Sequence, residues 1–117
     1  MSIVVIYHNN RCSKSRETLK LLEEQGTPFE VVEYLKTPPT KAVLEELARK
    51  LEMKPLDFVR KGEKLYKEKY AGKTFTDEQW LSILAENPVL IERPIVVKGD
   101  KAAIGRPPEN VLQIIRD

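Results

Sequence analysis

The first 35 residues constrain the fold of this chain more than any other segment, because they indicate a strand, a helix and a second strand. Residues 3–7 form a short, β-branched, apolar run, which is typical of a strand buried on both faces. Residues 15–25 place leucines on one helical face, and Gly26 is suited to ending that helix in a left-handed conformation. Residues 29–35 predict the second strand. This βαβ unit predicts a parallel strand pair with a right-handed crossover.

The middle of the chain predicts helices. Thr40 and Thr76 stand where helix caps are expected, Thr76 with the spacing of a capping box, and Pro55 is suited to opening a short helix between them. No stretch rich in glycine or serine separates this segment from its neighbours. We therefore expect a helical insertion at about residues 37–88 within a single domain that spans residues 1–117.

The C-terminal quarter indicates a hairpin and a final helix. Two short apolar runs, 95–97 and 102–104, flank a turn that contains Gly99, as in an antiparallel hairpin. Apolar residues after Pro108 suit a helix packed on the sheet. The order βαβ, helices, ββα predicts an α/β fold with one parallel and one antiparallel pair of strands.

Composition excludes several classes of protein. The 20 lysines and arginines against 18 aspartates and glutamates leave a net charge of +2, which is small for a protein that binds nucleic acid or an anionic membrane. The apolar run 3–7 is far shorter than a membrane span. One cysteine and one histidine allow neither an internal disulfide nor a metal cluster of His and Cys ligands. We expect a cytoplasmic protein without metal.

Cys12 is the candidate nucleophile, because it stands where the first strand passes into the first helix. Unpaired N–H groups and the helix dipole lower the pKa of a thiol at such a position, and the Ser15 hydroxyl is placed to donate a hydrogen bond to the thiolate. The polar residues around Cys12 argue against burial. The alternative is a small buried side chain that only packs. His8 is either a group that assists deprotonation or an ordinary strand-end side chain.

The absence of a second cysteine has a mechanistic consequence. A Cys-x-x-Cys pair can resolve an oxidised or adducted state by forming a disulfide, whereas the Cys12-x-x-Ser15 sequence of this chain cannot. A thiol from another molecule is then required. Glutathione or a protein thiol is the expected co-substrate.

Arg93 and Arg106 are the candidate anion ligands. Each precedes a proline, and they flank the predicted hairpin. A planar guanidinium makes two parallel contacts with a tetrahedral oxyanion, so arginines that converge on Cys12 form an oxyanion site. Spacing alone leaves open whether the two arginines converge on Cys12 or lie on the surface. It gives less support for a place of Arg60 in such a site.

Several motifs together resemble a known family, the glutaredoxin-coupled arsenate reductases, or ArsC family, over essentially the whole chain. The motifs are Tyr7-His-Asn9, Cys12-Ser-Lys-Ser15-Arg-Glu-Thr-Leu19, Arg60-Lys61, Arg93-Pro-Ile-Val-Val97 and Gly105-Arg-Pro107. The resemblance implies a thioredoxin-like fold, with a mixed four-stranded sheet and a helical insertion. It also implies that Pro94 is the cis-proline that faces the active cysteine in that fold.

The resemblance further implies a function. Cys12 matches the nucleophile that attacks arsenic, and three arginines match those that hold arsenate: Arg60, Arg93 and Arg106. His8 and Ser15 match groups around the thiolate. The implied partners are arsenate, glutathione as co-substrate and a glutaredoxin. We expect no bound cofactor and a monomeric protein. Family members often have proline two residues before the cysteine, so Asn10 in this chain predicts a looser turn.

Two other functions are compatible with the same residues. A glutathione-dependent thiol transferase would use Cys12 as well, with the arginines binding the carboxylates of glutathione. A regulator of the Spx type would bind RNA polymerase and use the fold as an interaction surface. Spx-type proteins typically carry Cys-x-x-Cys, whereas this chain has Cys-x-x-Ser and the full set of arginines. That difference favours an enzyme.

Overall fold

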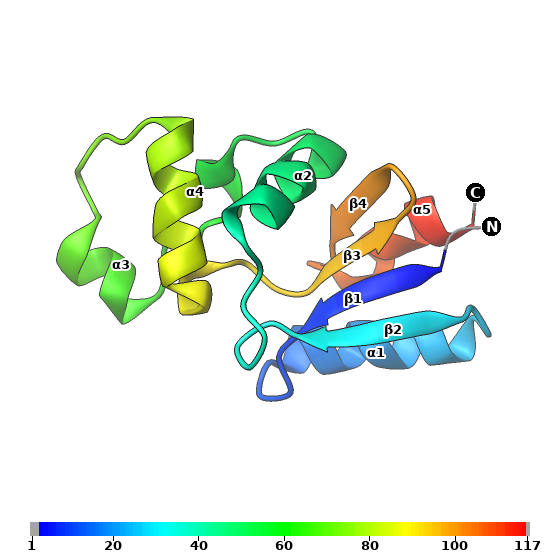
Figure 1. Ribbon diagram of the computed structural model, residues 1–117. Coiled ribbons are helices and arrows are strands. Elements are labelled where there is room, and N and C mark those ends of the chain that lie inside the picture. The colour runs from blue at the N-terminus through cyan, green and yellow to red at the C-terminus, as the bar shows by residue number, and fades with distance from the viewer. Residues whose placement is uncertain (1–2, 117) are drawn as a thin grey trace. The chain divides into compact units, whose positions relative to one another are not determined.

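The computed structural model describes residues 3–116, which form two compact units (Figure 1). The first unit combines the described residues up to Thr37 with those from Arg93 onward, and the second runs from Pro38 to Glu92. The sequence predicts a helical insertion at about residues 37–88, a range that overlaps this second unit. None of the helices within residues 3–116 combines the length and apolar character that a bilayer crossing requires.

The first unit is built on a mixed four-stranded sheet in the order β2-β1-β3-β4. Its strands are β1 (Val4–His8), β2 (Phe29–Glu33), β3 (Ile95–Lys98) and β4 (Lys101–Ile104). Strand β1 pairs with β2 in parallel and with β3 antiparallel, and β3 and β4 form the hairpin. The α/β fold with a parallel pair and a hairpin is thus confirmed. The parallel register places His8 beside Glu33 at the edge where both strands end.

Helices cover one face of this sheet. Helix α1 (Ser13–Glu24) packs on β1, and a 3-10 helix, η3 (Pro108–Val111), leads into α5 (Leu112–Ile115) beside β3 and β4. Gly26 follows α1 with a φ of 68°, the left-handed conformation expected there. Helix α1 begins at Ser13, one residue after Cys12 and two residues earlier than the segment 15–25 predicts.

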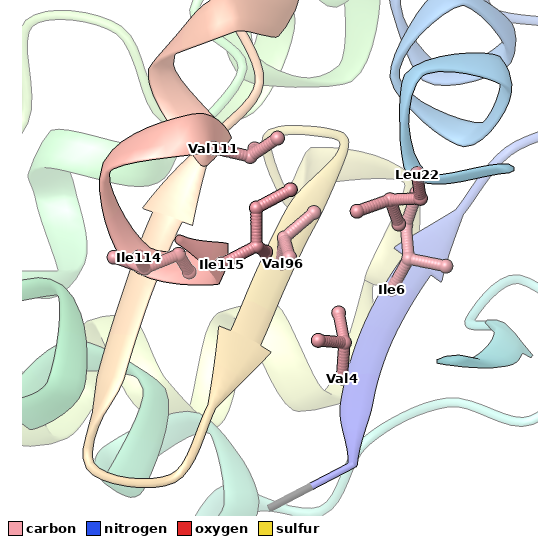
Figure 2. Packing of buried hydrophobic residues seen from close by; sticks show 7 residues of the cluster. All are labelled: Val4, Ile6, Leu22, Val96, Val111, Ile114 and Ile115. Atoms are coloured by element: carbon pink, nitrogen blue, oxygen red, sulfur yellow. The ribbon is translucent and has the colours of Figure 1, made fainter. Parts of the chain in front are cut away.

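The core of the first unit joins both chain segments (Figure 2). Val4 and Ile6 from β1 and Val96 from β3 point toward Leu22 of α1 and toward the C-terminal helices. The C-terminal contribution comes from Val111, Ile114 and Ile115. Burial of each such side chain stabilises the fold by about 1.5–3 kcal/mol. The apolar contacts therefore hold α1, and with it residue 12, in a fixed place relative to the hairpin.

The second unit is helical. Its elements are α2 (Lys41–Leu51), η1 (Pro55–Phe58), α3 (Lys64–Lys69), α4 (Asp77–Glu86) and η2 (Pro88–Leu90). The Thr40 hydroxyl accepts the N–H of Val43, and Thr76 and Gln79 form the reciprocal contacts of a capping box, as expected. Trp80 is buried, with the rings of three other aromatic residues around it.

Candidate active site

Cys12 is the N-cap residue of α1, at the junction of the first strand and the first helix. Its own N–H donates to the carbonyl of Asn9 at 3.0 Å, and its carbonyl accepts the N–H of Arg16 at 3.0 Å. These bonds place the thiol over the first turn of α1. The backbone N–H groups of Lys14 and Ser15 donate to its sulfur there.

The expectation that polar neighbours keep Cys12 out of the interior is wrong. Its side chain is only 7% exposed, and His8 is only 2% exposed. Part of the cover comes from far along the chain, because Arg106 Nη2 lies 3.4 Å from Cys12 Sγ across 94 residues of sequence. Local polarity does not report such a contact.

The surroundings of Cys12 lower the pKa of its thiol below the ordinary value. Burial by itself raises that pKa, because it disfavours the charged form. The N–H of Ser15, the charge of Arg93, the N–H of Lys14 and the charge of Arg106 act in the opposite direction and together outweigh burial. The geometry thus favours a thiolate, as the position before the helix predicts.

Arg93 and Arg106 converge on Cys12 from the two ends of the hairpin. Arg106 Nε donates to the carbonyl of Arg93 at 2.8 Å, while Nη2 of the same guanidinium reaches the sulfur. The N–H of Gly105 donates to the carbonyl of Pro94 at 3.0 Å and joins the two segments. The peptide bond before Pro94 is cis, as the resemblance implies, and so is the bond between Arg106 and Pro107.

Ser15 contacts the thiol through its backbone and not through its hydroxyl. Ser15 Oγ lies 2.6 Å from His8 Nδ1 and accepts the N–H of Asn9 at 3.0 Å. The expected hydroxyl contact with the thiolate is not among the bonds that the structure describes for this side chain. His8 is accordingly a buried residue that holds Ser15.

Arg60, the third predicted arginine, belongs to the second unit. Its Nη1 lies 3.2 Å from a carboxylate oxygen of Glu63 and 3.4 Å from the carbonyl oxygen of Val89. Its side chain is 21% exposed. The role of Arg60 toward an anion stays a prediction.

Asn10 and Glu33 are polar groups of the site that the sequence reasoning missed. Asn10 Oδ1 lies 2.8 Å from His8 Nε2, and Asn10 Nδ2 donates to Glu33 Oε1 at 3.0 Å. The Asn10 side chain therefore ties this turn to His8 of β1 and Glu33 of β2, and the looser turn expected from asparagine in place of proline stays a prediction. The signal was available, since parallel pairing of the first two strands brings residue 8 to residue 33.

A cavity of about 340 Å³ lies beside this turn. Residues 8–11 line one part of it, and Glu33, Leu35 and Lys36 line the other. Within residues 3–116, no three His, Cys, Asp or Glu side chains come together as a metal-binding group.

The fold and the site define a class. The protein has a mixed sheet in the order β2-β1-β3-β4, a cysteine before the first helix and a cis-proline before the third strand. These features define a thioredoxin-like α/β protein. The chain belongs to the ArsC family, whose profile matches residues 7–114.

Similar proteins span nearly the whole chain. YfgD of Escherichia coli (strain K12), which is named as an uncharacterized protein, is 51% identical over 114 residues and covers 96% of each chain. An arsenate reductase of Neisseria meningitidis serogroup A is 43% identical over 117 residues, or 98% of this chain and 100% of the relative. The solved structure of arsenate reductase from Vibrio cholerae has a TM-score of 0.92 at 48% identity and covers 97% of this chain and 98% of that one.

Proposed function

We propose that this protein is an arsenate reductase that forms a covalent Cys12–arsenic adduct and takes its electrons from glutathione and a glutaredoxin. The observation that carries the proposal is the Arg106 guanidinium, 3.4 Å from the sulfur of a cysteine whose pKa is lowered. The family, and relatives named arsenate reductase, supply the substrate class.

The proposed anion site combines guanidinium groups with a helix N-terminus. Arg106 and Arg93 act on the sulfur, and the first turn of α1 adds unpaired N–H groups that favour anions. Arg60 of the second unit is a further candidate ligand of the anion on the family resemblance alone. The cations neutralise charge, so that an anionic sulfur can approach an anionic oxyanion.

The proposed reaction begins with attack of the Cys12 thiolate on arsenic. An S–As bond forms, and one arsenate oxygen leaves as hydroxide or water. Glutathione then displaces a second oxygen, again as water, and forms a second S–As bond. A glutaredoxin thiolate attacks the glutathione sulfur, and the electron pair of that S–As bond passes to arsenic. Arsenic(V) becomes arsenic(III), and hydrolysis of the adduct releases arsenite and returns the thiolate.

The external thiols follow from the cysteine count. The chain has one cysteine, so both electrons come from thiols of other molecules: one of glutathione and one of glutaredoxin. The products of that oxidation are arsenite and a mixed disulfide between glutaredoxin and glutathione. Each turnover therefore couples to glutathione reductase and NADPH.

The test is NADPH oxidation by the purified protein with glutathione, glutaredoxin, glutathione reductase and arsenate. We expect consumption that requires arsenate and is abolished in Cys12→Ser. NADPH consumption that does not depend on arsenate but requires a glutathione mixed disulfide as substrate would support a thiol transferase instead. No consumption with either substrate, together with binding to RNA polymerase, would support a regulator.

A further inference from the structure

Four side chains form a continuous hydrogen-bonded chain beside Cys12. Glu33 Oε1 accepts from Asn10 Nδ2 at 3.0 Å, and Asn10 Oδ1 lies 2.8 Å from His8 Nε2. His8 Nδ1 lies 2.6 Å from Ser15 Oγ, which also accepts the backbone N–H of Asn9. The chain runs from the edge strand β2 to a buried hydroxyl three residues after the proposed nucleophile.

The Glu33 carboxylate fixes which group donates and which accepts at every step of this hydrogen-bonded series of side chains. A carboxylate only accepts hydrogen bonds, so the Asn10 amide must turn its NH₂ group toward Glu33 and its oxygen toward His8. Arg16 Nη1 donates to the Asn10 carbonyl at 2.9 Å and holds the backbone of this residue as well. The amide oxygen also only accepts, and His8 Nε2 must therefore carry a proton.

The tautomer of His8 decides what the Ser15 hydroxyl can do. A neutral imidazole with its proton on Nε2 presents Nδ1 as an acceptor, so Ser15 donates its single O–H proton to the ring. The Ser15 oxygen accepts from Asn9 in turn. No donor of this hydroxyl is left for the sulfur, and the bonds from Ser15 and Lys14 to the thiolate are made by backbone N–H groups.

We propose that Asn10 is a positioning residue, which is oriented by Glu33, holds His8 as the Nε2–H tautomer and thereby keeps the Ser15 hydroxyl from donating to Cys12. The inference rests on the proposed function only in taking Cys12 as the nucleophile. Nucleophilicity of a thiolate falls as its pKa falls. Withholding one more donor from the sulfur thus preserves its reactivity, while the N–H groups and arginines keep it ionised.

The test is nitrogen-15 NMR of the histidine ring, which is unambiguous because the chain has one histidine. Spectra are recorded at a pH where the ring signals no longer change, so that the ring is neutral. We expect protonated Nε2 and unprotonated Nδ1 in the wild-type protein. In Asn10→Leu, which removes both amide contacts, we expect the signals to shift toward the Nδ1–H tautomer.

Two further variants control the experiment. Glu33→Leu leaves the Asn10 amide free to turn over, so it should shift the tautomer in the same direction even if Asn10→Leu fails to fold. Lys36→Met removes the 3.5 Å ion pair with Glu33 but leaves the amide contact, and it should give the wild-type spectrum. Protonated Nδ1 in the wild-type protein, or an unchanged tautomer in both Asn10→Leu and Glu33→Leu, would overturn the proposal.

Alkylation of the single cysteine supplies the functional readout, with no need for arsenate. In Asn10→Leu we expect the released Ser15 hydroxyl to turn toward the thiolate, so the inflection of rate against pH should move to lower pH and the plateau rate should fall. A loop that merely loosens loses its N–H contacts and moves the inflection upward. An upward or absent shift would overturn the role given to Ser15. Either result leaves the arsenate assay to decide the proposed function separately.

Discussion

Reactivity at Cys12 depends on a balance that only neighbouring residues can supply. A cysteine that is 7% exposed resembles one that only packs, and burial alone raises the pKa of its thiol. Backbone N–H groups and two guanidinium charges reverse that effect. Burial and a lowered thiol pKa therefore occur together at Cys12, whereas the sequence reasoning took a buried cysteine and a reactive one as alternatives.

The first prediction concerns ionisation of Cys12. The rate of alkylation by iodoacetamide against pH should show an inflection below that of a free thiol, about 8.5, because the pKa is lowered. Arg106→Ala removes the charge that lies 3.4 Å from the sulfur, and the inflection should move upward. An Arg106→Ala profile that superimposes on the wild-type one would show that this guanidinium does not act on the thiolate.

The second prediction concerns substrate. Arg93→Ala and Arg106→Ala should each lower kcat/KM for arsenate by about ten- to a hundredfold, the value of one hydrogen bond to a charged group. Lysine in place of either arginine should keep only part of the wild-type kcat/KM, because a point charge cannot reproduce a two-donor contact. Arg49→Ala is the control, since this residue is 60% exposed and pairs only with Glu46 among the described ion pairs. Unchanged kcat/KM in both alanine variants would contradict the proposal that these arginines bind the oxyanion.

At the scale of elements, the site depends on a close approach between α1 and the hairpin. Gly105 lies at the end of β4, and a Cβ atom there would come within 2.5 Å of Thr18 Oγ1 and 2.9 Å of Pro94 Cγ. Any larger residue would push the hairpin away from α1. Since Arg106 follows directly, the same displacement would carry its guanidinium away from the sulfur.

The third prediction tests this approach with a matched pair of substitutions. Gly105→Ala should lower the free energy of unfolding by about 1–3 kcal/mol, as overpacking does, and should reduce the alkylation rate of Cys12 at neutral pH. Gly62→Ala should change stability by less than about 0.5 kcal/mol, because a Cβ there meets nothing within 4 Å. Urea unfolding of the two variants measures the difference, and equal stabilities would contradict the packing argument.

Sequence periodicity predicts these elements well, and their long-range contacts poorly. The first strand and helix, the hairpin, and the caps at Thr40 and Thr76 depend on residues a few positions apart, so a local pattern reports them. The contact of Arg106 with Cys12 joins residues 94 positions apart, and no periodicity records it. The family resemblance supplied that pairing. The link from Asn10 to Glu33 was recoverable only through the parallel register.

At the scale of the whole molecule, the ionisation of Cys12 is linked to folding. The pKa of its thiol is lower in the folded chain than the value of about 8.5 expected when unfolded. Between the folded and unfolded pKa values the unfolded state binds one more proton, so stability rises with pH in that window. The contribution is fully present above the unfolded pKa and is lost as pH falls through the folded one.

The fourth prediction follows from this linkage. The free energy of unfolding of the wild-type protein, minus that of Cys12→Ser, should increase with pH up to about 8.5 and then become constant. Urea titrations under reducing conditions at a series of pH values measure it, and subtracting the variant cancels the other titrating groups. A difference independent of pH would mean that folding does not perturb the thiol.

The first unit takes its strands from both sides of the segment Pro38–Glu92. During synthesis, Cys12 leaves the ribosome long before β3 exists to complete the sheet, and before Arg106 exists to reach the sulfur. A nascent chain that ends ahead of residue 93 consequently lacks both guanidinium charges that help to lower the pKa of the Cys12 thiol. The electrostatic environment of the thiol is therefore completed only when the last two strands and Arg106 have been synthesised.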